Sequence, residues 1–304
     1  MFTRLLIPLD GSKLAEAVLP AAAYLAKTLE IPVTLLHIIE RNAPEEIHGE
    51  THLTNETEAR AYLDSIAGQK YWPDVVIESH VHTAEVTDVA ESIVAHANEL
   101  QTDLIVLCTH GSGGLRSLVI GTIAQQVINL GRTPVLAIQA DQSGVSAIFN
   151  CRRMLIALDG KPDHEKGLRV AAEFAGECEA SLHLVTVVPT RRELLMEQAA
   201  TARLLPGSTS ALLDLSVSSA ESYLLGLVHE YAQRGFHITA EVLRGEPAAM
   251  LIRAAEQNRT NLIVLGTHGK SHMDAFWSGS LTPQIAKGTH IPLLLVPIHN
   301  HDQE

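Results

Sequence analysis

The run Leu-Ile-Val-Leu-Gly-Thr-His-Gly at residues 262–269 decides the fold of this chain. Its first four residues are apolar and mostly branched, as in a strand that is buried on both faces of a sheet. A loop follows, and the run Gly-Ser-Leu-Thr-Pro at residues 279–283 predicts the start of a helix, because serine is a common cap and proline is tolerated in the first turn. Glycine lets a ligand approach the backbone, and a helix N-terminus presents unpaired N–H groups that suit phosphate. Strand, loop and helix together predict a nucleotide site.

The spacing of the glycines narrows the kind of site. Gly266, Gly269 and Gly279, with Ser280 after them, form the pattern Gly-x2-Gly-x9-Gly-Ser. This is neither the P-loop pattern, which contains a Gly-Lys-Ser/Thr run, nor the Gly-x-Gly-x2-Gly fingerprint of dinucleotide-binding folds. Taken alone, the same glycines are also compatible with a loop that only makes tight turns.

The chain contains this pattern twice. The run at residues 104–107 is again Leu-Ile-Val-Leu, and it is followed by Thr-His-Gly at 109–111 and Gly-Thr at 121–122. Near the start of each half, Leu-Ile-Pro-Leu-Asp-Gly at 6–11 matches Leu-Ile-Ala-Leu-Asp-Gly at 155–160. Order, spacing and local sequence agree between the halves, which indicates an internal duplication.

Each half is predicted to fold as its own domain, the first over residues 1–140 and the second over residues 151–298. In both, segments typical of buried strands alternate with amphipathic helices in the order β-α-β-α-β-α-β-α-β. This alternation predicts an α/β fold in which a parallel sheet is covered by helices on both faces. Ligands of such sheets bind beyond the carboxyl ends of the strands. Asp10 or Asp159 and the glycine loop of the same half would meet there if the first and fourth strands are neighbours.

Three helical segments are less regular. The first helix, at about residues 14–29, has Pro20 near its middle, which predicts a kink or a shifted boundary. In the second half the connection after the second strand is long for a compact domain, so we expect a short added helix at about residues 192–204. The helix after it is expected at about residues 217–234.

Composition argues against several classes of protein. The 304-residue chain carries a formal net charge of −13, which argues against a broad surface for nucleic acid or anionic membranes. Its three cysteines, Cys108, Cys151 and Cys178, include no Cys-x2-Cys pair, so we expect a reducing compartment and neither a disulfide framework nor a thiolate zinc site. No apolar run approaches membrane-spanning length, and the first one meets Pro8 and Asp10 too early for a signal peptide. These features predict a soluble cytoplasmic protein.

The glycine pattern, found late in an α/β unit, resembles the ATP-binding signature of the universal stress protein family, and the duplicated chain resembles the tandem members of that family. The resemblance covers essentially the whole chain. It implies two tandem Rossmann-like domains of the adenine nucleotide alpha hydrolase-like kind, each with a five-stranded parallel sheet. The two halves would pair as an intramolecular pseudo-dimer, with a homodimer as a further option. ATP binding and a regulatory role in the stress response are also implied, usually without a dedicated catalytic apparatus.

By this resemblance, the nucleotide is expected mainly in the second half. Ala157, Asp159 and Val187 are expected at the adenine. Leu265 and Gly266 are expected at the ribose. The phosphates are expected at Gly269, Gly279, Ser280 and Leu281. A weaker set in the first domain consists of Asp10, Ile38, Gly111, Gly121 and Thr122. Cys108 stands where the second half has Gly266, and its side chain would crowd the ribose, so the first half is either a weaker site or a structural copy. Mg²⁺ would be carried by the phosphates, because the sequence offers no carboxylate cage.

Other functions stay open. The chain has no Gly-x-Ser-x-Gly elbow and no His-Glu-x2-His helix, so slow ATP hydrolysis is the most that we expect of it as an enzyme. A module that acts on a protein partner through the pseudo-dimer is the other candidate. Asp159 could instead make a turn or cap a helix, and Cys108 would be a redox sensor only if its pKa were lowered. The pair His80 and His82 is a weak metal candidate, because zinc sites need three or four ligands.

Overall fold

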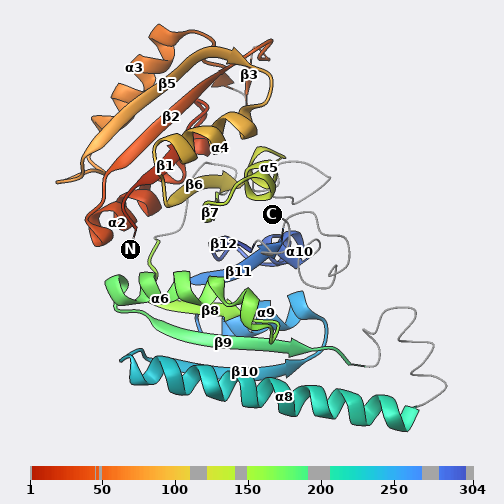
Figure 1. Ribbon diagram of the computed structural model, residues 1–304. Coiled ribbons are helices and arrows are strands. Elements are labelled where there is room, and N and C mark those ends of the chain that lie inside the picture. Colours follow the sequence, from red (N-terminus) through yellow and green to blue (C-terminus); the bar gives the residue numbers. More distant parts are fainter. Residues whose placement is uncertain are drawn as a thin grey trace. The chain divides into compact units, whose positions relative to one another are not determined.

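The computed structural model describes residues 2–44, 46–47, 50–109, 122–140, 149–190, 206–268 and 281–298. The chain divides into two compact units (Figure 1). The first consists of Met1–Asn150 with two short later segments, one of which holds the last strand. The second consists mainly of Cys151–Gly266 together with the last helix. The glycines Gly111, Gly121, Gly269 and Gly279, and Ser280, lie outside the described residues.

The first unit contains a mostly parallel sheet of strand order β5-β2-β1-β6-β7-β12. Its elements are β1 (Leu5–Pro8), α1 (Lys13–Glu16), α2 (Leu19–Leu29), β2 (Val33–Glu40), β3 (Glu46–Ile47), β4 (Glu50–Thr51), α3 (Glu56–Ala67), β5 (Ile77–Val86), α4 (Val89–Glu99), β6 (Leu104–Thr109), α5 (Thr122–Leu130), β7 (Val135–Gln139) and β12 (Leu293–Ile298). The strands from β5 to β7 are parallel, whereas β12 runs antiparallel to β7. β3 and β4 form a separate antiparallel pair in the connection after β2.

The second unit has the parallel strand order β10-β9-β8-β11. Its elements are β8 (Arg153–Ala157), the 3₁₀ helix η1 (Pro162–His164), α6 (Lys166–Cys178), β9 (Ser181–Val188), α8 (Pro206–Gln233), β10 (Ile238–Arg244), α9 (Pro247–Gln257), β11 (Leu262–His268) and α10 (Leu281–Gly288). The strand order reverses between β10 and β11, so right-handed crossovers place α6 and α8 on one face and α9 on the other. α10 packs against α9.

The expected α/β class and the expected neighbours are confirmed. In each unit the first and fourth strands of the repeat are paired: Leu5 lies beside Leu104, and Met154 beside Leu262. The apolar runs that predicted these strands are buried in the cores. The antiparallel contact of β12 with β7 was not expected. Both are the last strands of their repeats, and their pairing satisfies backbone groups that a free sheet edge would expose.

The irregular helices are explained by local chemistry. The expected helix at 14–29 is divided into α1 and α2, and Pro20 lies in the first turn of α2, where its missing N–H costs little. α8 begins at Pro206, eleven residues before the expected start at 217. The added helix expected at 192–204 falls outside the described residues.

Helix α8 corrects the expectation that no segment reaches membrane-spanning length. Its residues Gly207–Gln233 are long and apolar enough to span a membrane by length and composition alone. In the second unit this helix packs against β9 and β10, and Leu213 and Ala220 share a small core with Val188. Only 22% of the apolar window is buried, and Leu212, Leu215 and Leu225 are exposed. One such helix is weak evidence for a membrane span.

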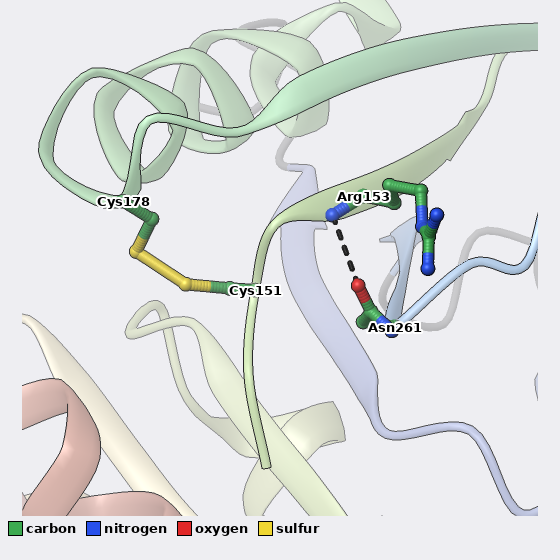
Figure 2. Close-up of a disulfide and its surroundings, with 4 residues drawn as sticks. All are labelled: Cys151, Arg153, Cys178 and Asn261. Carbon is green, nitrogen blue, oxygen red and sulfur yellow. Dashed lines mark hydrogen bonds between the residues drawn. A yellow bond between two sulfur atoms is a disulfide. The ribbon is translucent and has the colours of Figure 1, made fainter.

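Two of the three cysteines form a disulfide, which overturns the expectation of unpaired thiols. Cys151 and Cys178 are joined at a Cα–Cα distance of 6.3 Å and a sequence separation of 27 (Figure 2). Cys151 lies two residues before β8 begins, and Cys178 is the last residue of α6. A strand followed by a returning helix brings these two positions together, a proximity that no short Cys-x-Cys spacing reveals.

Candidate functional site

The site expected in the second half is organised by two neighbouring strands. β8 and β11 are in register from Met154 and Leu262 to Ala157 and Leu265, so Gly266 continues β11 where β8 gives way to the turn at Asp159. Both strands end at the same edge of the sheet, which is the edge where α/β sheets bind ligands. The structure therefore brings Ala157, Asp159, Leu265 and Gly266 together at this edge.

The carboxylate of Asp159 is held in a defined position. One oxygen accepts the N–H of Lys161 at 3.1 Å, and the other lies 2.6 Å from Nδ1 of His164. The side chains of Asp159 and His164 are nearly buried, at 7% and 9% exposure. Gly160, between the two bonded partners, has a φ of +81°, which a residue with a side chain adopts only under strain. Asp159 thus makes the turn that the sequence offered as its alternative role, and its second oxygen is held by a histidine.

The first turn of α6 lies directly above Gly266. A Cβ atom placed on Gly167 would lie 3.7 Å from Cγ1 of Val264 and 3.8 Å from the backbone nitrogen of Gly266. The glycine at 167 therefore allows the start of α6 to approach the end of β11 closely. The N-terminal end of a helix carries partial positive charge, so this approach places favourable potential beside the candidate ribose position.

Three other expected residues point into the protein rather than into open space. Val187, Leu265 and Leu281 are at most 5% exposed. Their side chains belong to the core of the second unit, so only backbone atoms of these residues are suited to contact a ligand. Gly269, Gly279 and Ser280, expected at the phosphates, lie outside the described residues.

In the first unit the corresponding turn is covered by its own chain. Asp10 accepts bonds from the backbone N–H and the hydroxyl of Ser12, at 2.9 and 2.7 Å. Gly11 has a φ of +93°, and a Cβ on it would lie 2.9 Å from the side chain of Leu53. At Gly160, the matching glycine, a Cβ would meet no described atom within 4 Å. The turn is therefore closed by Leu53 in the first unit and uncovered by described residues in the second.

His37 fixes this cover in place. Its Nδ1 lies 2.8 Å from the carbonyl oxygen of Leu9 at the end of β1, and its Nε2 lies 3.1 Å from the carbonyl oxygen of Leu53. The residue is 1% exposed. The matching position of the second half is Thr186, which is too short to make such a bridge, and its buried hydroxyl has no partner in the described part of the chain.

Acidic groups also surround the first turn. Burial, followed by the charges of Glu16 and Asp10, raises the pKa of Tyr62, and Glu50 adds to the effect. Glu50 also accepts the backbone N–H of Lys13 at the start of α1. Asp10 and Glu16 have acidic counterparts in the second half, Asp159 and Glu165, so Glu50 is the added negative charge at the first turn that opposes the binding of a triphosphate.

The second unit contains a tyrosine–glutamate hydrogen bond that was not predicted from the sequence. The hydroxyl of Tyr223 in α8 donates to Oε1 of Glu165 at 2.9 Å, just before α6. Burial, and then this bond, raises the pKa of Tyr223. Glu165 matches Glu16 when the halves are aligned on their Asp-Gly turns, but the same alignment sets Ala211 opposite Tyr62, so it did not identify Tyr223 as the partner.

Cys108 is not a reactive thiol. Burial raises its pKa to about 12, against a smaller opposite effect of a hydrogen bond from the backbone at Ala140. A thiol with this pKa is almost fully protonated near neutrality, so the lowered pKa that a redox sensor needs is absent. Of the other residues expected in the first domain, Ile38 is buried, and Gly111, Gly121 and the side chain of Thr122 lie outside the described residues.

The histidine pair on β5 belongs to a cluster. The rings of His80 and His82 each lie 4.9 Å, centroid to centroid, from the ring of His96 in α4. Nδ1 of His96 lies 2.7 Å from the carbonyl oxygen of Ser92. Among the described residues, no group of three or more histidine, cysteine or acidic side chains is arranged to hold a metal ion.

Comparison with known proteins places this fold. The model of the universal stress protein family matches residues 1–139 and again residues 150–297. The chain belongs to the universal stress protein family. A universal stress protein of Mycolicibacterium smegmatis is 24% identical over 305 residues, covering 96% of each chain. One from Mycobacterium tuberculosis is 22% identical over 297 residues, covering 95% of each chain.

Solved structures support the same fold. A universal stress protein from Archaeoglobus fulgidus superposes with a TM-score of 0.71 at 15% identity, covering 97% of this chain and 98% of the other. A putative universal stress protein from Pseudomonas aeruginosa has a TM-score of 0.66 at 14% identity, covering 97% and 93%. The tandem Rossmann-like architecture is therefore shared along the whole chain.

Proposed function

We propose that this universal stress protein binds ATP mainly in its C-terminal half and acts as a regulator in the stress response. The observation that carries the choice of half is the contrast between the two aspartate turns. Leu53 packs over Gly11 in the first unit, whereas no described atom lies within 4 Å of a Cβ placed on Gly160. An adenine needs an uncovered strand edge, and no described residue covers the Gly160 side of the second turn.

The chemistry of the second site fits a nucleotide. Asp159 is fixed by His164 and presents a polar group beside the adenine position. Gly266 offers bare backbone at the end of the neighbouring strand, beside the start of α6. The phosphates would be bound by N–H groups of Gly269, Gly279 and Ser280, as the glycine pattern implies, and Mg²⁺ would be held by the phosphates themselves.

Calorimetric titration of the purified chain with ATP, AMP and Mg²⁺ tests this function. Gly266→Ala and Gly279→Ala are expected to weaken ATP binding by at least about tenfold, because each adds a side chain where phosphate or ribose must approach. The matched first-half variants, Gly111→Ala and Gly121→Ala, are expected to leave the affinity within about twofold of the parent. Unchanged affinity in both second-half variants would remove the site assignment. Rapid steady-state release of ADP would instead indicate an ATPase.

A further inference from the structure

The disulfide encloses one complete strand–helix unit. Cys151 lies at the start of β8 and Cys178 at the end of α6, so the loop that they close contains β8, the Asp159 turn, η1 and α6. Cys151 is fully buried and Cys178 is 6% exposed. The bond therefore ties the two ends of this unit inside the protein, not on its surface.

The first half builds the same junction without sulfur. Alignment of the halves on their Asp-Gly turns sets Phe2 opposite Cys151 and Leu29 opposite Cys178. Phe2 is 7% exposed, and Leu29 is the half-buried last residue of α2. The first half thus forms the same strand–helix unit with apolar residues at both positions, so we expect the fold of the second unit not to require the covalent bond. Two reduced cysteines, which behave as small apolar side chains when buried, would fill the same space.

Backbone contacts hold the two ends together independently of the disulfide. The N–H of Ser181, three residues after Cys178, donates to the carbonyl oxygen of Arg152 at 2.9 Å. The N–H of Arg153 donates to Oδ1 of Asn261 at 3.2 Å (Figure 2). The N–H of Asn261 donates back to the carbonyl oxygen of Arg153 at 2.8 Å. After reduction the bond between Ser181 and Arg152, which lie next to the two ends of the unit, would keep the two sulfur atoms close, while Asn261 keeps the start of β8 in place. The disulfide could therefore form again within the folded chain.

We propose that Cys151 and Cys178 form a reversible thiol–disulfide site whose oxidation locks the β8–α6 unit. A low-molecular-weight disulfide such as oxidised glutathione is the oxidant. One cysteine thiolate attacks a sulfur of glutathione disulfide, forming a mixed disulfide and releasing one glutathione thiolate. The second cysteine thiolate then attacks the protein sulfur of that mixed disulfide and releases the other. Two protein thiols lose two protons and two electrons, and one glutathione disulfide gains both to become two glutathione thiols.

The burial of Cys151 and Cys178 limits the rate at which they exchange with small thiols and disulfides. A small thiol reaches Cys178 only when the end of α6 opens, so exchange follows sustained changes in redox poise rather than brief ones. Oxidation stabilises the second unit by restricting its unfolded chain, and the effect grows with the length of the closed loop. Asp159 and His164 lie within the unit that the disulfide closes, but formation of the disulfide does not depend on whether these residues bind a ligand.

Redox titration of a Cys108→Ser background, which leaves only this pair, tests the proposal. The protein is equilibrated in glutathione buffers of graded ratio, trapped with an alkylating reagent and mapped without reduction. We expect the peptides of Cys151 and Cys178 to become linked reversibly as the share of glutathione disulfide rises. The oxidised second unit should melt about 10 °C higher than the reduced one, given the loop length. Hydrogen exchange in β8 and α6 should slow on oxidation more than in the other elements.

A double variant, Cys151→Ala and Cys178→Ala in the same background, is the matched control and should melt equally in both buffers. Three results would overturn the proposal. One is a pair that stays as thiols in the most oxidising buffer. Another is a disulfide that is reduced only after the unit has unfolded. The third is equal melting of the oxidised and reduced forms.

Discussion

Nδ1 of His164 lies 2.6 Å from Oδ2 of Asp159, and both side chains are almost excluded from solvent. A hydrogen bond to a carboxylate in such surroundings contributes about 1.5–3 kcal/mol to the free energy of unfolding. When one partner is removed, the other remains buried without a hydrogen bond, which costs further stability. We therefore expect Asp159→Asn to lower the free energy of unfolding of the second unit by about 1–3 kcal/mol.

A double-mutant cycle with Asp159→Asn and His164→Ala checks that this loss belongs to the pair. Urea denaturation of the four proteins should give an interaction energy of at least about 1 kcal/mol. Additive effects of the two substitutions would show that the side chains do not stabilise each other.

His37 is expected to be the most costly single histidine to remove from the first unit. His37→Leu leaves the carbonyl oxygens of Leu9 and Leu53 without its ring nitrogens, so the free energy of unfolding should fall by about 2–4 kcal/mol. Trp72, buried in the same unit, reports the transition by fluorescence in a Trp277→Phe background. The exposed residue His290, in the same unit, supplies the control, since His290→Leu should change stability by less than about 0.5 kcal/mol. A similarly small effect of His37→Leu would contradict the bridge.

Thr186, at the position that matches His37, should respond in the opposite direction. Its hydroxyl is buried and has no partner in the described part of the chain. Replacing such a group with an apolar one of the same shape is neutral or stabilising, so Thr186→Val should raise the free energy of unfolding by up to about 1 kcal/mol. Thr186→Ser keeps the hydroxyl and removes a methyl group, and it should lower stability by about 1 kcal/mol. A destabilised valine variant would mean that the hydroxyl has a partner.

The histidine cluster predicts acid sensitivity of the first unit. Burial, and then the neighbouring His96, lower the pKa of His80; His82 and Arg60 act in the same direction, and Glu99 opposes them. The unfolded chain therefore binds a proton more readily at this residue than the folded chain does. Its stability contribution is present above the ordinary histidine pKa of about 6.5 and is lost as the pH falls from there towards the folded value.

The denaturant concentration at the unfolding midpoint of the first unit should accordingly decrease when the pH is lowered from 7.5 to 5.5. His80→Gln should make that fall smaller, because the group that takes up the proton on unfolding is gone. His290→Gln, at an exposed position, should leave the pH dependence unchanged. Equal slopes for the parent and His80→Gln would contradict the assignment to His80.

The repeat made much of the fold predictable. Matching residues 6–11 with 155–160 fixed the positions of the first strands and the two aspartates, and the apolar runs before Cys108 and Gly266 fixed the fourth strands. Periodicity and local pattern are sufficient for such elements because each one is decided by its own residues.

Contacts between distant residues were not predictable in the same way. The cover that Leu53 makes over Gly11 depends on how the connection after β2 folds back, and no local pattern specifies that path. The disulfide joins residues that are 27 positions apart, and only alignment with Phe2 and Leu29 shows that they share a junction. The first half was expected to be the weaker site because of Cys108, and Leu53, His37 and the carboxylate of Glu50 supply further reasons for that expectation.

The exchange of Cys108 and Gly266 between the halves tests the central claim most directly. Calorimetric titration with ATP and Mg²⁺ should show one site per chain in the parent protein. Gly266→Cys should weaken binding by at least about tenfold, while Cys108→Gly should leave the affinity and the single site unchanged, because Leu53 still covers the first turn. Full affinity in a folded Gly266→Cys protein, or a second site gained in Cys108→Gly, would contradict the account.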